Sequence, residues 1–281
     1  MKRIIYVLAL VVFLVKASFS AAYEWKKDGE RLTYDVNWSF LNVGQAELLF
    51  RTNADNYKII GRAWTGKSVN AVYHLLDRIL IQGQLQNGGL LTESYTAFLN
   101  ENNYKAHKTV LYDRSQGKGY YKNIHGGLAP VAYPIEEDSR DLMTALYHLR
   151  SLEKELKIGD VYKLPIFELD SLYEMQMHVR EKRRMKTVLG KIDLFRIQPV
   201  MVGLGDANKR VKDRLSIWVT ADKRFIPVKI EIDLPVGSFH AMLTRYGAAD
   251  SVSEAPEYLP EKGKIDTDKG KNTTHVNFIT D

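Results

Sequence analysis

The feature that most constrains this chain is an alternation of apolar and polar residues with a period of two, which begins at Arg31 and recurs along most of the sequence. From Leu32 to Trp38 every second residue is apolar, so an extended segment would have one apolar and one polar face. Clusters of Gly, Asn and Asp interrupt the alternation at short intervals, which is typical of strands joined by tight turns. The pattern predicts a mainly β, antiparallel protein.

The alternation predicts strands along almost the whole chain. After a strand that ends near Trp38 and a second that carries Ala46, Leu48 and Phe50, we expect strands at residues 57–63, 77–85, 93–99, 104–113, 118–122, 161–167, 172–180, 192–198, 213–220, 225–233 and 238–246. A sheet of more than roughly ten strands must curl, split or close. We therefore expect a single large curved antiparallel sheet, as a half-barrel or barrel.

Two segments have helical periodicity instead. Residues 67–76 predict a short helix, and residues 139–156 predict the longest helix, capped by Asp138 or Ser139. The apolar stripe of the longer helix consists of Leu142, Met143, Ala145, Leu146 and Leu149. Because a helix of this kind covers or plugs a sheet, we predict that it forms a lid.

Both ends of the chain differ from this β region. Residues 1–22 combine Lys2 and Arg3 with an apolar run and small residues, the pattern of a cleaved signal peptide. Residues 250–281 contain few large apolar side chains and cannot offset the entropy lost on ordering, so we expect a mobile tail. Residues 23–249 contain no Pro/Ser-rich linker and are expected to form one β-rich domain.

Charge and cysteine content limit the classes of function. The 281-residue chain has 40 Lys and Arg against 34 Asp and Glu, and its net charge falls from +6 to +3 without residues 1–22, which hold three bases and no acid. This excess is too small to indicate nucleic-acid binding. Cysteine is absent, which excludes disulfides, thiol catalysis and a lipid-modified N-terminal Cys. With no later segment of membrane-spanning length, the sequence predicts a soluble periplasmic protein that is not a lipoprotein.

One motif formally matches a phosphate-binding loop, since Gly61, Gly66, Lys67 and Ser68 fit the pattern G-x-x-x-x-G-K-S. Such a loop follows a buried parallel strand and works with an acidic residue that holds Mg²⁺. Here the preceding strand is predicted to be antiparallel, no apolar strand ends in Asp at a suitable place, and ATP is absent outside the cytoplasm. We interpret the match as a chance one and expect no cofactor.

Catalytic and metal-binding patterns are not apparent in the sequence. The seven histidines include no pair at metal-binding spacing, and no G-x-S-x-G motif anchors a Ser-His-Asp triad. Glu136, Glu137 and Asp138 precede the predicted lid helix, where negative charge stabilises a helix N-terminus. The sequence therefore predicts no catalytic residue and no metal site.

Two groups of basic residues lie in or beside predicted connections. They consist of Arg180, Lys182, Arg183, Arg184, Lys186 and Lys191, and of Lys209, Arg210, Lys212 and Arg214. We place the first group in a turn-like connection. It is either a solvated hairpin tip or a surface for anionic headgroups or an acidic partner.

Apolar residues on the inward phase of the predicted strands are the candidates for a ligand-lining wall. They are Trp38, Phe50, Met175, Met177, Ile217 and Ile230. Packing in a filled core is the alternative for the same side chains, because methionine and branched residues serve both roles. Arg214 and Lys229 fall on the opposite phase, so they would meet an anionic headgroup only at a rim.

Three stretches with matching order and spacing carry a family resemblance. They are Leu32–Phe40 with Val43–Ala46, Asp141–Arg150, and Ile217–Asp222 with Pro227–Ile230 and Gly237–Ser238. Over residues 30 to 246 the chain resembles an exported bacterial family classified only as a domain of unknown function, number 3108. The resemblance implies an envelope location and a mainly β fold with one prominent helix, and it implies no activity.

The last of these stretches also resembles, more weakly, a hairpin of lipoprotein-localisation-type carriers, in which a helical lid closes a curved half-barrel over an apolar cavity. Three functions follow in order of preference. The first is a non-catalytic periplasmic protein that binds a lipid or other apolar ligand within its curved sheet. The second is an envelope assembly protein with a filled core and a protein partner, and the third is a hydrolase of envelope material.

Overall fold

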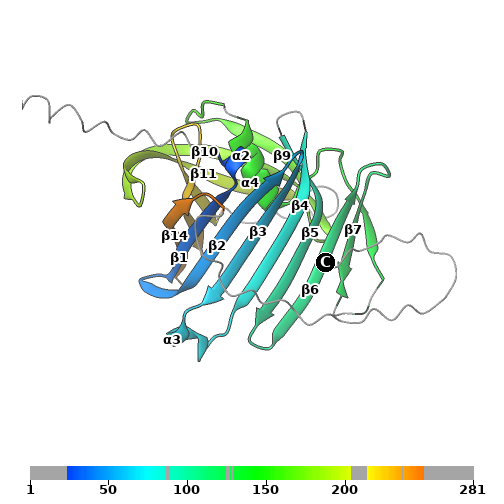
Figure 1. The fold of residues 1–281 in the computed structure, drawn as a ribbon, viewed down its shortest axis with the longest axis horizontal. Coiled ribbons are helices and arrows are strands. Elements are labelled where there is room, and N and C mark those ends of the chain that lie inside the picture. Colours follow the sequence, from blue (N-terminus) through cyan, green and yellow to red (C-terminus); the bar gives the residue numbers. More distant parts are fainter. Residues whose placement is uncertain are drawn as a thin grey trace, which may run out of the picture.

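The fold is one curved sheet with the helix Leu142–Ser151 at one of its ends (Figure 1). In this computed structural model the described residues are 24–86, 89–124, 127, 129–152, 154–203, 214–235 and 237–249. The predicted signal peptide and the predicted mobile tail lie outside the described residues. All fourteen strands belong to the same antiparallel sheet. The predicted large curved antiparallel sheet is therefore confirmed.

The strands follow the predicted alternation closely. Their bounds are β1 Glu30–Trp38, β2 Leu41–Asn53, β3 Asn56–Thr65, β4 Leu76–Gln86, β5 Gly89–Glu101, β6 Tyr104–Asp113, β7 Lys118–Asn123, β8 Val131–Pro134, β9 Val161–Glu168, β10 Ser171–Thr187, β11 Gly190–Gly203, β12 Leu215–Thr220, β13 Pro227–Asp233 and β14 Ser238–Gly247. Neighbours in the chain are neighbours in the sheet, except for β8 and β9, which form its two edges. β1 pairs with β14, so the order runs from β8 through β1 to β14 and on to β9.

The two edges of the sheet approach each other without pairing directly in the described chain. Arg140, in the segment after β8, forms a parallel bridge with Ile166 of β9. The Tyr112 hydroxyl of β6 donates to the Phe167 carbonyl oxygen of β9 over 2.7 Å. These contacts bring the edges together, which gives the sheet a barrel-like form that stays open.

Within the described residues, three short helices accompany the sheet: α2 Trp25–Asp28, α3 Lys67–Asn70 and α4 Leu142–Ser151. α2 and α4 lie at one end of the sheet and α3 lies at the other, which we call the distal end (Figure 1). The predicted helix at 67–76 is wrong in length, because the Thr65 amide bonds to the Leu75 carbonyl oxygen and draws the chain into β4.

The predicted helix at 139–156 is also too long. It begins at Leu142 because the carboxylate of Asp141, and not Asp138 or Ser139, accepts from the Met143 and Thr144 amides. Two predictions about strands fail as well. β8 was not expected, and the basic residues from Arg180 to Lys191 lie in and beside the paired strands of the β10–β11 hairpin instead of a turn-like connection.

Candidate functional site

The sheet face that α4 covers, called the inner face, carries the main core of the β9–β12 half. Met175, Met177 and Ile217 are buried there with Leu146 and Leu149 of α4. Ile230 is partly buried against the same cluster. Four of the six predicted wall residues thus come together, and helix side chains pack directly over them.

The other two predicted wall residues lie apart from this cluster. Phe50 is buried in a separate aromatic cluster, with its ring centroid 4.8 Å from that of Tyr147 in α4. Trp38 is exposed at the distal end of β1. Of the predicted rim cations, Lys229 pairs with Glu231 on the outer face at 2.5 Å, and the carbonyl oxygen of Arg214 accepts from the Asp233 amide.

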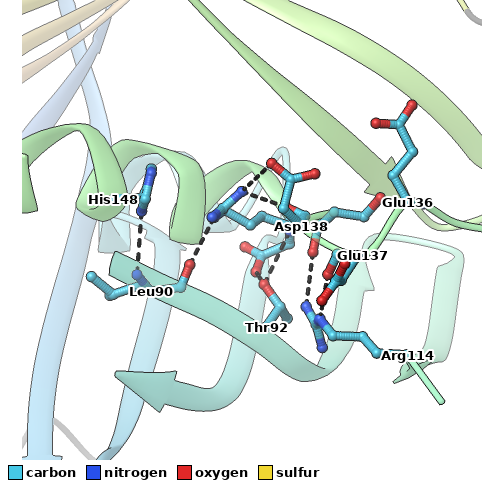
Figure 2. A network of polar contacts seen from close by, with 10 residues as sticks. Leu90, Thr92, Arg114, Glu136, Glu137, Asp138 and His148 are labelled. Carbon is cyan, nitrogen blue, oxygen red and sulfur yellow. Dashed lines mark hydrogen bonds and ion pairs between the residues drawn. The ribbon is translucent and has the colours of Figure 1, made fainter. Parts of the chain in front are cut away.

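Buried polar contacts fix the N-terminus of α4 to β5 (Figure 2). The Thr92 hydroxyl donates to Asp141 Oδ2 at 2.6 Å, and the Asp141 amide donates back to the Thr92 oxygen at 3.2 Å. Arg140 Nε donates to the Leu90 carbonyl oxygen at 2.7 Å. Because Asp141 also caps the helix, its carboxylate is fully engaged in holding the fold.

Basic residues hold the segment that precedes α4 (Figure 2). Arg114 Nε donates to the Glu137 carbonyl oxygen at 2.8 Å and Arg114 Nη2 donates to that of Ser139 at 2.9 Å. Asp138 lies 3.6 Å from Arg140 and does not cap the helix. The three predicted carboxylates at 136–138 thus precede the helix without capping it.

Two titratable groups beside α4 are shifted by burial. Burial raises the pKa of Glu168 to about 7, and the negative charge of Asp141 acts in the same direction. Burial lowers the pKa of His148 to about 4, assisted by the positive charge of Arg140. His148 Nδ1 accepts from the Leu90 amide at 3.2 Å, a bond that needs the neutral ring. His148 therefore acts as a neutral acceptor, and Glu168 accepts from the Leu142 amide at the start of α4.

A buried ion pair fixes the C-terminal end of α4. Arg150 Nη2 lies 2.9 Å from Oε2 of Glu30 in β1, and both side chains are buried. The guanidinium of Arg150 lies between the rings of Trp25 and Tyr147, 4.7 and 4.9 Å from their centroids. α4 is therefore held to the sheet at both of its ends. Its side chains pack in the core at the end of the sheet opposite the distal end, which we call the proximal end.

Beyond α4 the inner face continues as apolar rows that the chain leaves partly exposed. Directly paired residues point to the same face, and the register joins Val36 to Ala241, Ala241 to Ile230 and Ile230 to Ile217. We call the half-buried residues away from α4 the distal inner face. They are Val36, Ile79, Leu99, Leu215, Ile230 and Ala241. Leu215 and Ile230 border the core cluster under α4, and Ile79 and Ala241 border the two neighbouring clusters, so this face begins at the edge of the core.

The contacts that an added Cβ atom would make at two glycines of the inner face indicate how much space lies above the sheet there. A Cβ built on Gly61 would meet only its sheet neighbours Leu48 and Ile79, at 3.6 and 3.7 Å. A Cβ on Gly119, close to β9, would lie 2.2 Å from the Phe167 ring. The interior is tightly packed where the edges meet, whereas nothing from an opposite wall comes within 4 Å of the Gly61 position.

Polar groups join the distal inner face at its β6–β7 side. The register carries the row from Gly61 through Ile79 and Ala97 to Lys108 and Asn123. Lys108 Nζ lies 5.8 Å from the Tyr104 ring centroid and forms no ion pair with a described residue. Asn123 Oδ1 is buried without a hydrogen-bond partner. A cation and an unsatisfied amide thus lie side by side on an apolar face.

The residues of the formal phosphate-loop motif occupy a different context from a nucleotide site. Gly61 lies inside β3, between the antiparallel strands β2 and β4. Gly66, Lys67 and Ser68 lead into a helix of only four residues. In the described part of the chain, no group of His, Asp or Glu residues is arranged to hold a metal ion, and no helix is long and apolar enough to cross a membrane.

The comparisons with known proteins agree with this architecture. The family model described as "Protein of unknown function (DUF3108)" matches residues 33–244. The chain belongs to the DUF3108 family. Among curated proteins, none matches this DUF3108 protein. Its fold is similar to the crystal structure of a β-barrel-like protein of domain of unknown function DUF1849 from Brucella abortus, with a TM-score of 0.55 and 11% identity, covering 79% of this chain and 98% of that chain.

Sequence reasoning missed the polar part of the site. Lys108 lies within the predicted strand 104–113 and Asn123 directly follows the predicted strand 118–122, with nothing unusual in their spacing. The alternation of the strand could have indicated it, because Lys108 lies on the same face of the strand as the buried residues Val110 and Tyr112. A lysine on the apolar phase of a strand is a feature that sequence alone can indicate.

Proposed function

We propose that this DUF3108 protein binds an amphiphile on its distal inner face, with no chemical transformation. The observation that carries the proposal is that apolar rows continue beyond the core under α4 onto a face that the described chain leaves partly exposed. Exposed contiguous apolar surface on a soluble domain marks a site for an apolar ligand or partner. A concave sheet face presents that surface to a long, narrow molecule better than to a flat one.

The polar side of the site favours a ligand with an anionic headgroup. Lys108 has no carboxylate partner among the described residues and lies opposite Asn123 in the register. The anionic group of such a ligand would meet Lys108. The Asn123 Oδ1 atom is an acceptor without a partner, so a headgroup that also carries an O–H or N–H donor gains free energy by bonding to it. Asp77, on the same face, is already engaged by the Asn100 amide at 3.0 Å.

We propose further that the protein is exported and has no enzymatic activity. Residues 1–22 support export through their signal-peptide pattern, although they lie outside the described residues. The titratable groups gathered near α4 support a role without catalysis. Asp141 caps the helix, His148 accepts from the Leu90 amide, and Glu168 lies next to the helix N-terminus. None of these groups is left over for acid–base chemistry.

A binding experiment with matched variants tests the proposal. Delipidated protein is titrated with a dansyl-labelled fatty acid, whose fluorescence rises in an apolar site. We expect Gly61→Leu to weaken binding at least tenfold, because the new side chain occupies the space above β3, whereas Gly61→Ala binds as the wild type does. Lys108→Glu should also weaken binding, and Lys105→Glu, exposed on the outer phase of the same strand, should not. Equal binding by all four variants would contradict the proposal.

A second function is favoured by a different observation. Residues 181–193 of the β10–β11 hairpin pair only within the hairpin, because the ladders with β9 and β12 end at His178 and Leu194. Lys182, Arg184, Lys186 and Lys191 are exposed on one face of this extension, and Arg183 is exposed on the other. This basic arm suits an acidic envelope partner. Native mass spectrometry of protein purified from its own envelope separates the two functions, since it would reveal either a bound amphiphile or a bound polypeptide.

A further inference from the structure

Large apolar side chains protrude at the distal end of the sheet. Phe40, in the β1–β2 turn, is 98% exposed, and Val72, between α3 and β4, is 86% exposed. Ser39 adopts a left-handed φ of 55° in the β1–β2 turn, a conformation that a non-glycine residue enters only where the surrounding chain holds it. Trp38, Leu41, Tyr73, Ile232 and Leu234 are exposed nearby. We call these seven residues the distal rim.

Hydrogen bonds between successive connections make the distal rim one continuous surface. The Ser39 amide bonds to the Ser238 carbonyl oxygen at 2.7 Å, which joins the β1–β2 and β13–β14 turns. The Gly66 amide bonds to the Val43 carbonyl oxygen, which joins the α3 connection to β2. The exposed side chains therefore form one surface along neighbouring strands of the sheet.

Charge is nearly absent from these connections. Residues 37–43 and 234–239 contain no charged side chain, and residues 64–76 contain one cation, Lys67, besides His74. Exposed loops of soluble proteins are normally polar, because apolar side chains in water are costly. The opposite, proximal side of the molecule carries the basic β10–β11 extension instead. Asp233, between the rim residues Ile232 and Leu234, is exposed, and the Tyr73 hydroxyl donates to Glu101 at 3.1 Å. The distal rim thus combines high apolar exposure with few charged side chains.

We propose that the distal rim docks on the surface of a lipid bilayer. The low charge favours this occupant: with Lys67 in these connections and Asp233 directly beside them, little charge has to lose water when the rim enters the headgroup layer. The residue types favour it too, since Trp and Tyr place apolar rings and a polar group together at the membrane interface. Phe40 and Val72 stand on separate connections, so each enters the headgroup layer without needing a matching pocket.

Docking there would place the proposed ligand site next to its source. In the register, Trp38 pairs with Phe239, Phe239 with Ile232 and Ile232 with Leu215, so the rim runs directly into the distal inner face. An amphiphile could pass from the bilayer to the inner face along this apolar row. The purpose of docking rests on the proposed function, whereas docking itself does not.

Vesicle flotation tests the inference. The full-length mature protein is mixed with vesicles of phosphatidylethanolamine and phosphatidylglycerol, and the floated fraction is measured. We expect Phe40→Ser and Val72→Ser each to weaken vesicle binding by at least about tenfold, from the lost burial of one large apolar side chain. Ile158→Ser and Val188→Ser remove apolar residues that are 62% and 51% exposed away from the rim, and both variants should bind as the wild type does.

The outcomes separate docking from ligand binding. Gly61→Leu should keep vesicle binding while it loses uptake of the dansyl-labelled fatty acid, and Phe40→Ser should do the reverse. Wild-type protein that fails to float, or rim and control variants that float equally, would overturn the inference. A wild-type dimer that Phe40→Ser converts to monomer, with no vesicle binding in either form, would also overturn it and assign the rim to a second copy.

Discussion

Glu30 and Arg150 form a fully buried ion pair that ties the first strand of the sheet to the end of α4, with Oε2 and Nη2 2.9 Å apart. Burial alone would lower the pKa of Arg150, but the charge and hydrogen bonds of Glu30 outweigh it and raise the pKa. The arginine also donates from Nε to the Arg224 carbonyl oxygen, in the connection between β12 and β13. One side chain therefore links α4 to both halves of the sheet.

Removing one member of this pair should destabilise the protein strongly. Glu30→Gln leaves the Arg150 charge buried without a counter-charge, and we expect a loss of about 3–5 kcal/mol in the free energy of unfolding. Glu174→Gln breaks the solvent-accessible pair with Lys163 and should cost at most about 1 kcal/mol. Urea unfolding of both variants measures the difference. Similar losses would mean that Glu30 and Arg150 are solvated.

Truncating two leucines of α4 should destabilise the protein to very different extents. Leu146 is 7% exposed in the core cluster, whereas Leu142 is 40% exposed, contrary to the predicted stripe. We expect Leu146→Ala to lower the free energy of unfolding by about 2–5 kcal/mol and Leu142→Ala to change it far less. Chemical denaturation checks both. Wild-type stability in Leu146→Ala would show that α4 is not docked.

Glu168 should make stability depend on pH. Its pKa rises from 4.5 to about 7 in the folded protein, so between these values the folded state binds more protons than the unfolded state. Its stabilising contribution is therefore complete below pH 4.5 and is lost as the pH rises through 7. We expect Glu168→Gln to gain stability relative to the wild type over that window. The opposite contribution of His148, with its pKa lowered to about 4, is present in both proteins and cancels. A difference that does not vary with pH would contradict the assignment.

The two inner-face glycines should differ in their tolerance of alanine. A Cβ at Gly119 would overlap the Phe167 ring, so Gly119→Ala should cost about 1–3 kcal/mol and loosen the contact between the two sheet edges. Gly61→Ala meets only ordinary contacts and should leave stability unchanged or slightly higher. Thermal unfolding compares the two. Loss of stability in Gly61→Ala would show that the space above β3 is filled.

The strands were predictable because their signal is local. The alternation within one strand, such as that from Leu32 to Val36, is enough to show which of its faces is buried. The alternation alone placed Met175 and Ile217 on the inner face. β8 was missed because four residues ending in Pro134 show no alternation. The basic residues were assigned to a turn because a run of charged residues is typical of a loop. In the structure they belong to paired strands, with Arg184 opposite Asp193.

The state of the interior could not be predicted in the same way. Whether α4 fills or merely covers the sheet depends on Asp141 meeting Thr92 and on Arg150 meeting Glu30, which are polar residues from distant strands. Such contacts have no periodicity. The same holds for the unsatisfied Asn123 oxygen and for the contact between Tyr112 and Phe167 that draws the edges together.

The pairing of β1 with β14 governs the order in which the protein can acquire its structure. The Thr244 hydroxyl donates to the Thr33 carbonyl oxygen across 211 residues of sequence, at the seam between the two halves of the sheet. Until β14 has emerged, β1 and β13 present unpaired backbone groups that can pair with other chains. The sheet can therefore be completed only after β14 is made, and we expect the slow folding of a protein with high contact order. Truncation before Ser238 should yield an aggregating fragment, even though it leaves the described parts of thirteen strands intact.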